Sequence, residues 1–334
     1  MRSIIICLLL LVGSVAGASD FSSWRPSTEE DQRLDIAAFE SLNKDIREKF
    51  GDVQSAVVIL QGRKVYEFHR DGQADALHAV HSVAKSALAL LVGTALQRGQ
   101  LTSLDQPVLA LMPEWKALNT DPRASSITLG HLLSMTPGFD IDDASGTAPV
   151  QAPASAWSRT IGATPGQRFA YDNSVPSIVL AILERATGQT IEALASEQLF
   201  KPLAMREPSL QRGKLRMRTE DMAKLGHLVL SNGSWSGQPL MPDGFAAQII
   251  RARSNGGDPV RLPYGLFWWV PSGSTYFASG YGGQLVWVHA PMNLVVAVTS
   301  EVSRESPRRG HALKLTRGPL FQAVRGRISG APRP

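Results

Sequence analysis

The spacing of apolar and polar residues predicts a helix and a pair of strands near the start of the chain. Across residues 29–50, apolar side chains recur near helical spacing among charged ones, which predicts one amphipathic helix. Residues 53–60 and 64–69 are rich in β-branched and aromatic side chains, as strands usually are. Because only Gln61-Gly62-Arg63 separates these runs, we expect them to form a hairpin.

The middle of the chain has the pattern of helices separated by proline and glycine. A long apolar helix is predicted to start near Ser82 and to end at Gly99. Most of residues 105–250 also carry helical patterns. One example is the stretch 175–187, where a proline stands in the first turn and a glycine follows the last residue. Residues 140–153 are rich in Asp, Ala, Gly and Pro, which predicts a surface loop.

The last part of the chain changes to strand-like patterns. We predict a closing helix over residues 311–324 and strands at residues 267–270, 275–278, 284–289 and 294–299. Strands at both ends with helices between them predict one sheet built from the N- and C-terminal parts, with a helical domain inserted. The predicted α/β sheet domain comprises 19–75 plus 251–334, and the mainly helical domain 76–250. An active site is expected in the cleft between them.

The first eighteen residues have the features of a secretory signal peptide, residues 1–18. A short positive start precedes an apolar run over residues 4–12, and small side chains at 16–18 suit a cleavage site. A membrane anchor is the alternative, but the run is shorter than the roughly 20 residues that span a bilayer. A lipoprotein is a weaker alternative, because Cys7 lies inside the apolar run rather than at its end. We therefore expect an exported protein, periplasmic or secreted.

Composition and charge narrow the class of partner. Without residues 1–18 the chain has no cysteine, which excludes disulfides and a thiol nucleophile. The formal net charge is +5, and losing Arg2 with the signal leaves 5 − 1 = +4. Basic residues do not interleave with aromatic ones in a stripe, so nucleic acid is not an expected partner. A weak association with anionic envelope polymers fits the charge. The pattern does not indicate an oligomeric state.

The start of the apolar helix carries the first candidate for catalysis. A serine hydroxyl needs a base within hydrogen-bond reach, and Lys85 follows Ser82 at i+3, on the same helix face. The positive end of the helix disfavours a protonated lysine and would stabilise an oxyanion near Ser82. The same spacing occurs at Ser41 and Lys44, but that copy lies among charged residues within the predicted helix 29–50. We interpret Ser41 as a surface residue.

Two further segments carry groups that suit hydrolysis. Tyr171-Asp172-Asn173 precedes the helix predicted over 175–187. The phenol of Tyr171 can relay a proton beside a lysine, and Asn173 can donate to a substrate carbonyl or to the lysine. The alternative is an ordinary loop tyrosine with an asparagine cap. The segment 278–284 is rich in glycine and enters a predicted strand, where a backbone N–H could complete an oxyanion hole with that of Ser82. The alternative is a plain glycine-rich hairpin.

The other motifs do not indicate a metal, a cofactor or another hydrolase class. His78 and His81 are three residues apart without an acidic or third histidine partner nearby in sequence, so metal binding is not expected. His81 precedes Ser82 and is a candidate to line the cleft. Residues 19–334 contain no G-x-S-x-G motif, which argues against an α/β-hydrolase.

The order and separation of these three segments resemble the serine β-lactamase and penicillin-binding protein superfamily. The chain is most similar to its class C-like branch, which includes D,D-peptidases, β-lactamase-fold esterases and 6-aminohexanoate-dimer hydrolases. The resemblance extends over nearly all of residues 19–334. Supporting stretches are found at residues 99–105, 127–138, 200–205 and 264–269. It implies a β-lactamase/transpeptidase-like α/β (α+β) fold, with an antiparallel sheet flanked by helices.

The resemblance also implies roles for the candidate residues. It makes Ser82 the acylated nucleophile and Lys85 and Tyr171 the general acid/base pair, with the first proton acceptor left open between them. Asn173 becomes the amide of the second motif. The third motif becomes Ala278, Ser279 and Gly280, with Tyr281 supplying the oxyanion N–H. The resemblance thus implies four substrate or oxyanion contacts, which are Asn173, Ser279, Gly280 and Tyr281.

One departure from the family pattern affects the substrate. The third motif of the family usually opens with Lys or His, whereas Ala278 or, in a shifted register, Tyr281 stands there. The cation that would hold a substrate carboxylate is missing in either register. We therefore expect a serine hydrolase acting on a small-molecule ester or amide without metal or cofactor. The alternatives are β-lactamase or D,D-peptidase activity and a non-hydrolytic penicillin-binding or sensor protein.

Overall fold

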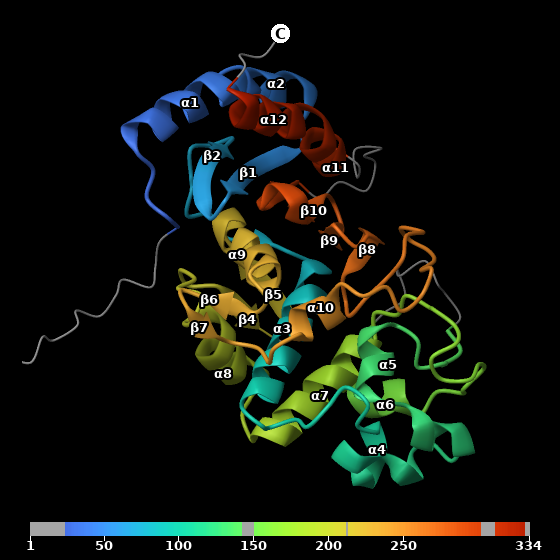
Figure 1. Cartoon of the computed structure of the whole chain (residues 1–334). Helices are drawn as coiled ribbons and strands as arrows, with labels where there is room; N and C mark the ends of the chain where they lie inside the picture. The colour runs from blue at the N-terminus through green and yellow to red at the C-terminus, as the bar shows by residue number, and fades with distance from the viewer. Residues whose placement is uncertain (1–23, 142–149, 212, 302–310, 331–334) are drawn as a thin grey trace, which may run out of the picture.

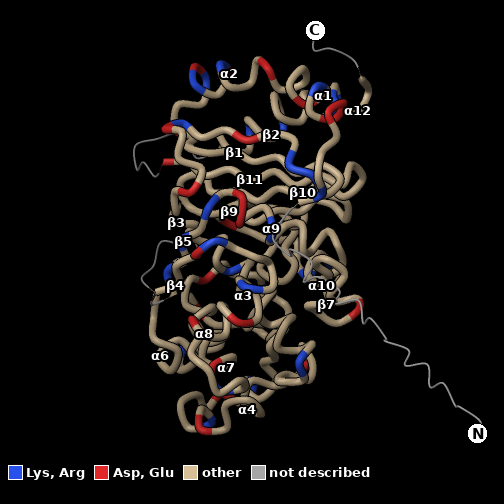
Figure 2. The backbone as a smooth tube through the Cα atoms, turned by 90° about the vertical axis from the view of Figure 1, so that its left-hand side faces the viewer, with Lys and Arg blue, Asp and Glu red and all other residues tan. Residues whose placement is uncertain are grey.

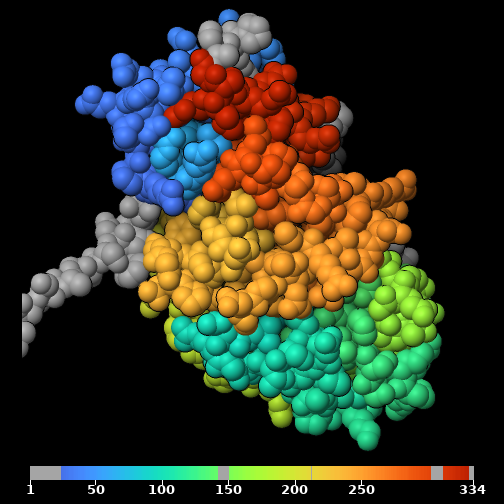
Figure 3. All heavy atoms as spheres, in the orientation of Figure 1, coloured from blue at the N-terminus to red at the C-terminus, as the bar shows by residue number. Residues whose placement is uncertain are grey.

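A six-stranded antiparallel sheet forms one part of the fold. The computed structural model describes residues 24–141, 150–211, 213–301 and 311–330. The strand order is β2-β1-β11-β10-β9-β8. The strands are β1 (Val53–Leu60), β2 (Arg63–His69), β8 (Trp269–Ser272), β9 (Thr275–Gly280), β10 (Gln284–His289) and β11 (Leu294–Ser300). Because β1 pairs with β11, the two ends of the chain share one sheet (Figure 1), and Figure 3 shows N-terminal (blue) and C-terminal (red) atoms side by side. The predicted fold class is confirmed.

Helices cover both faces of this sheet (Figure 1). Helix α9 (Thr219–Leu230) packs on one face, and α1 (Glu29–Phe39), α11 (His311–Leu315) and α12 (Phe321–Ser329) lie on the other. Gly226 lets α9 approach closely, because a Cβ there would come within 2.7 Å of a Val286 methyl group. The central strand β11 is therefore buried along its whole length.

The helical part is built around α3 (Val83–Gln97), which is buried through most of its length. Its predicted end is confirmed, because Gly99 adopts φ 68°. The predicted helix over 175–187 is also confirmed as α7 (Val175–Thr187), followed by Gly188 at φ 68°. The other α-helices here are α4 (Val108–Leu111), α5 (Leu129–Leu133), α6 (Pro153–Trp157), α8 (Ile191–Ala195) and α10 (Phe245–Ile249). No helix of the described residues is long and apolar enough to cross a membrane.

Short strands interrupt the helical part, which the sequence analysis did not predict. Strands β4 (Ser209–Gln211) and β5 (Lys214–Met217) form a hairpin, and β3 (His78–Ala79) pairs with β5. A second small hairpin joins β6 (Ser234–Trp235) to β7 (Gln238–Pro239). Because β3 ends three residues before Ser82, the sheet of β3, β4 and β5 holds the segment that leads into the apolar helix.

The predicted single helix over residues 29–50 is wrong. It consists of α1 and α2 (Leu42–Lys49), with a break at Glu40 and Ser41. Phe39, Leu42 and Ile46, on either side of the break, are all buried. Ser41 therefore lies at a helix start rather than within a helix, and it is exposed.

The C-terminal elements differ from their predicted limits in two places. Strand β8 begins at Trp269, two residues later than predicted, because Phe267 has φ 56° and leaves the extended conformation. The closing helix continues to Ser329 and is kinked at Gly318, next to Pro319, which cannot donate a helical hydrogen bond. The predicted signal at 1–18 lies outside the described residues, as does most of the predicted loop 140–153.

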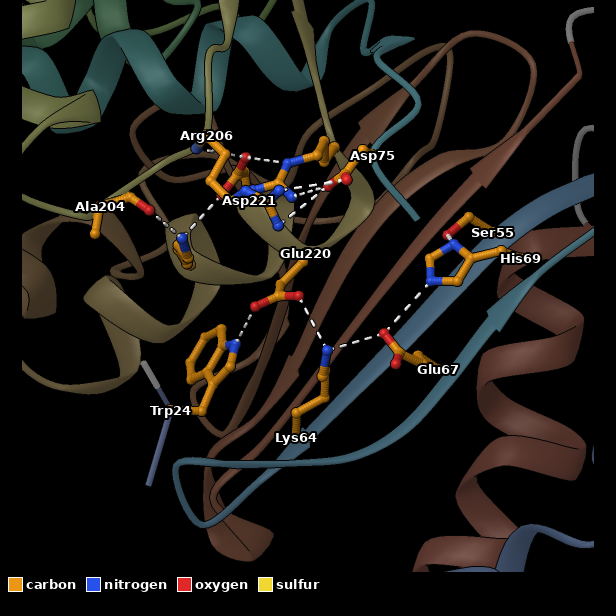
Figure 4. Close-up of polar contacts among 12 residues, drawn as sticks. Trp24, Ser55, Lys64, Glu67, His69, Asp75, Ala204, Arg206, Glu220 and Asp221 are labelled. Atoms are coloured by element: carbon orange, nitrogen blue, oxygen red, sulfur yellow. Dashed lines mark hydrogen bonds and ion pairs between the residues drawn. The ribbon is translucent and has the colours of Figure 1, made fainter. Parts of the chain in front are cut away.

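Ion pairs join the sheets to α9 (Figure 4). Lys64 Nζ of β2 lies 3.2 Å from Glu220 Oε2 at the start of α9. Asp221 is fully buried, and its carboxylate lies 2.9 Å from Lys224 Nζ and 3.3 Å from Arg218 Nε. Arg218 also pairs with Asp75, just before β3, at 2.5 Å. Figure 2 shows acidic and basic residues interspersed over the molecule, between α2 at the top of the view and α4 at the bottom.

Candidate active site

Ser82 lies at a sharp turn between β3 and α3. Pairing of β3 with β5 holds the preceding segment, and Val80 N donates to Leu215 O at 3.1 Å. His81 then adopts φ 48°, an uncommon value for a side chain larger than glycine. This turn brings Ser82 to the N-terminal end of α3, where its hydroxyl is only partly buried.

Lys85 joins the first two predicted segments. Its Nζ donates to Ser82 Oγ and to Asn173 Oδ1, each at 2.9 Å, and the residue is 9% exposed. The same Nζ lies 4.9 Å from the ring centroid of Tyr171. The structure therefore brings Ser82, Lys85, Tyr171 and Asn173 together. An amine beside a serine hydroxyl is the arrangement that proton transfer from that hydroxyl requires.

The second segment is held by its own buried contacts. Asp172 accepts a hydrogen bond from Ser174 N at 2.7 Å and pairs with Arg159 Nη2 at 2.6 Å. The ring of Tyr171 stacks on Trp269, with centroids 5.9 Å apart and an interplanar angle of 16°. These contacts fix both Tyr171 and the neighbouring Asn173 relative to α3.

Two aromatic residues that were not predicted to belong to the site pack against Tyr171. Trp269 stacks on its ring, and Tyr264 meets it edge-on at 6.3 Å. Burial, with the nearby Tyr171 phenol, raises the pKa of Tyr264 well above its usual value. Tyr264 therefore remains a neutral phenol at physiological pH. The aromatic density of residues 264–269 was the available signal.

The third segment approaches Ser82 through Gly280. A Cβ at Gly280 would come within 2.4 Å of Val80 O, so only glycine allows β9 to lie this close. Ala278 shares the Gly280 face of the strand and is 1% exposed, whereas Tyr281 lies beyond the end of β9. Neither Ala278 nor Gly280 lines the cavity at Ser82, whereas Tyr281 lines it.

The remaining residues of the third segment differ in position. Tyr281 meets His81 edge-on, with centroids 5.8 Å apart, and both line the cavity at Ser82. Ser279 pairs with Leu285 within the sheet, and strand alternation directs its side chain away from the Gly280 face. Its side chain does not line the cavity.

A cavity of about 1030 Å³ opens at these groups. Ser82, Lys85, Asn173 and Tyr281 line it on one side. Residues 213–218 contain three basic side chains. Lys214 lines the cavity, whereas Arg216 donates to Leu77 O and Arg218 is buried in ion pairs. Among the described residues, no group of three or more His, Cys, Asp or Glu side chains has a geometry that could hold a metal ion.

A partly buried serine beside a lysine at i+3, with an asparagine from a distant segment, is the site type that the resemblance implies. The sequence matches the family model described as beta-lactamase over residues 48–317. The chain belongs to the beta-lactamase family.

One curated protein is similar to this chain in sequence, and two solved structures are similar to it in fold. Esterase EstB of Burkholderia gladioli is 28% identical over 177 residues, which are 44% of this chain and 42% of the esterase. The match thus spans less than half of that curated relative. A structure assigned as a 6-aminohexanoate-dimer hydrolase, from Bacillus anthracis, has a TM-score of 0.68 and 18% identity, over 87% of this chain and 83% of that one. EstCE1, described as a hydrolase with promiscuous acyltransferase activity, has a TM-score of 0.66 and 15% identity, covering 89% and 99%.

Proposed function

We propose that this protein is a serine hydrolase that cleaves an ester or amide through an acyl-enzyme on Ser82. The observation that carries the proposal is the hydrogen bond of 2.9 Å from Lys85 Nζ to Ser82 Oγ. The family membership and the esterase relatives support the same reaction class. Ser82, Lys85 and Tyr171 are the proposed catalytic residues.

In the first step Ser82 Oγ attacks the substrate carbonyl carbon, and its proton passes to the neutral amine of Lys85. The backbone N–H groups of Ser82 and Tyr281 donate to the carbonyl oxygen as it becomes negative. The bond from carbon to the leaving oxygen or nitrogen then breaks, and the leaving group takes up the proton by way of Lys85 and Tyr171. The acyl group remains on Ser82.

In the second step a water molecule attacks the acyl carbon. Its proton passes to the same lysine–tyrosine pair while its oxygen bonds to the carbon. The bond from the carbon to Ser82 Oγ breaks, and the proton returns to that oxygen. The products are a carboxylic acid and the free enzyme. Asn173 holds Lys85 in place through the second hydrogen bond of its Nζ.

The absence of a cation at Ala278 favours substrates without a carboxylate anchor. A charge-assisted hydrogen bond of that kind contributes about 1.5–3 kcal/mol in other proteins. Activity on β-lactams or D-Ala-D-Ala peptides is the second candidate. The specific observation in its favour is Lys214, whose exposed side chain lines the same cavity and offers a positive charge.

A hydrolysis panel on the purified protein tests this proposal. It contains a short-chain nitrophenyl ester, a chromogenic cephalosporin, a D-Ala-D-Ala peptide and a linear aminohexanoate amide. We expect turnover of the ester, and loss of that turnover in Ser82→Ala. Acylation of Ser82 without turnover of any compound would instead identify a binding or sensor protein.

A further inference from the structure

The cavity at Ser82 continues as an apolar arm along α3. Ala84, Ala87, Leu88 and Leu91 line it, and their spacing places them along one face of the helix. A helix rises about 1.5 Å per residue, so Leu91 lies roughly 13 Å beyond Ser82 along the axis. The arm therefore leads away from the serine into the helical part of the molecule.

The opposite wall of the arm is also apolar. It is formed by side chains of α7, α8 and the helical turn Ser196–Phe200, namely Leu180, Ile191, Ala195, Leu199 and Phe200. Ala195 and Leu199 are fully buried, and Ile191 and Phe200 are at most 6% exposed. Ser177 of α7 also lines the cavity, but its hydroxyl donates to Ser174 O; the other side chains of these walls are apolar, so the arm suits a hydrocarbon group.

The polar side chains of the cavity gather near its entrance. Lys85 and Asn173 contact each other and Ser82. Lys214 precedes Leu215, whose carbonyl accepts from Val80 N beside the serine. One end of the cavity therefore suits an ester group, and the other suits an alkyl chain.

We propose that the arm binds the acyl chain of an ester substrate, with an optimum of about eight to ten carbons; this rests on the proposed hydrolase function. An extended chain advances about 1.2 Å per bond, so some ten bonds match the distance from Ser82 to Leu91. The acyl part is the better occupant than the alcohol. It remains bonded to Ser82 until water attacks, whereas the alcohol must leave through the entrance first.

Phe200, in the helical turn Ser196–Phe200, borders a second cavity. It lines both the arm and this cavity of about 500 Å³. Removal of the Phe200 ring would join the two spaces. Phe200→Ala should therefore lengthen the arm, and Ala87→Leu should shorten it.

The test compares two series of esters on the purified protein. In the first, the acyl chain grows from two to sixteen carbons on one nitrophenyl alcohol. In the second, the alcohol grows on a constant acetyl group. Burial of one methylene changes an affinity about fourfold, so we expect kcat/KM to rise about fourfold per methylene in the acyl series up to eight to ten carbons. A flat acyl series, or a rise confined to the alcohol series, would overturn the proposal.

Variants locate the effect in the arm. Ala87→Leu should move the optimum to four carbons or fewer, which the ratio of kcat/KM for the octanoate ester to that for the acetate ester measures. Ala37→Leu, the same change at an exposed position of α1, should leave the whole profile unchanged. Phe200→Ala should move the optimum to longer chains, which also serves if Ala87→Leu does not fold. Unchanged profiles in folded variants of both Ala87 and Phe200 would contradict the proposed location.

The outcome separates this inference from the proposed function. Hydrolysis of acetate with no dependence on acyl length would leave the hydrolase and remove the acyl arm. If no ester is hydrolysed, binding of ethyl octanoate and ethyl butyrate to Ser82→Ala, measured by calorimetry, decides the inference alone. Tighter binding of the octanoate by tenfold or more supports the arm, and equal binding refutes it.

Discussion

Replacement of Lys85 by methionine or arginine probes the central contact of the site. The Nζ of Lys85 donates to Ser82 Oγ and Asn173 Oδ1, both at 2.9 Å, and lies over the ring of Tyr171. Methionine keeps a similar length without a nitrogen. Arginine keeps the charge but does not give up its proton at any pH at which the protein is folded. The two variants therefore separate a base from an electrostatic partner.

We expect both variants to lose at least about 10²-fold in kcat. Removal of a general base typically costs 10² to 10⁴, which corresponds to about 2.7–5.5 kcal/mol of transition-state stabilisation. The loss can be greater because a serine and its base act as one unit. Lys85 is only 9% exposed, but its hydrogen bonds are made within the site. We therefore expect both variants to fold.

The assay is hydrolysis of a short-chain nitrophenyl ester, with thermal unfolding of each variant as the control for folding. Ser41→Ala is a matched control, because Ser41 has the same spacing to a lysine but lies exposed at the start of α2. It should keep full activity. Retention of most activity by Lys85→Arg would refute the reasoning, because the lysine would then act only through its charge.

Three further predictions concern pH, substrate and stability. Burial lowers the pKa of His227 to about 4 in the folded protein, so the unfolded chain binds a proton first and this residue alone should lower the free energy of unfolding by about 2 kcal/mol from pH 7.5 to pH 5. Urea unfolding at the two pH values measures this, because the fall in His227→Gln should be smaller by that amount; an equal fall in the variant contradicts it. Ala278→Lys should raise kcat/KM for a cephalosporin at least about tenfold relative to a short ester, whereas a wild type that already prefers the cephalosporin would contradict the role given to Ala278. Asp221→Ala should lower the free energy of unfolding by about 3–5 kcal/mol, because it leaves Lys224 and Arg218 buried without their shared carboxylate. Chemical denaturation measures the change, and a loss below about 1 kcal/mol would contradict a stabilising role of Asp221.

Patterns of neighbouring residues predict much of the fold and part of the site. The contact between Ser82 and Lys85 is predictable because both residues belong to one turn at the start of α3. The helix end at Gly99 and the hairpin of β1 and β2 are likewise set by neighbouring residues. The family resemblance added the contact from Lys85 to Asn173, which lie 88 positions apart.

The features that the sequence analysis missed depend on contacts between distant segments. Strand β3 has only two residues, too few for a periodic pattern, and exists because β5 supplies its partner. The break at Ser41 has no proline or glycine near it that the sequence pattern could use to predict it. The stacking of Trp269 on Tyr171 and the apolar arm beyond Leu88 arise only when β8, α3 and α7 are brought together.

Covalent labelling of Ser82 tests the central claim most directly. The protein is treated with a fluorophosphonate, digested, and the peptides are analysed by mass spectrometry. We predict that the added mass is found on the peptide that contains Ser82, and that Ser82→Ala and Lys85→Met label much more slowly or not at all. Labelling of another serine, with the Ser82 peptide unmodified, would contradict the account.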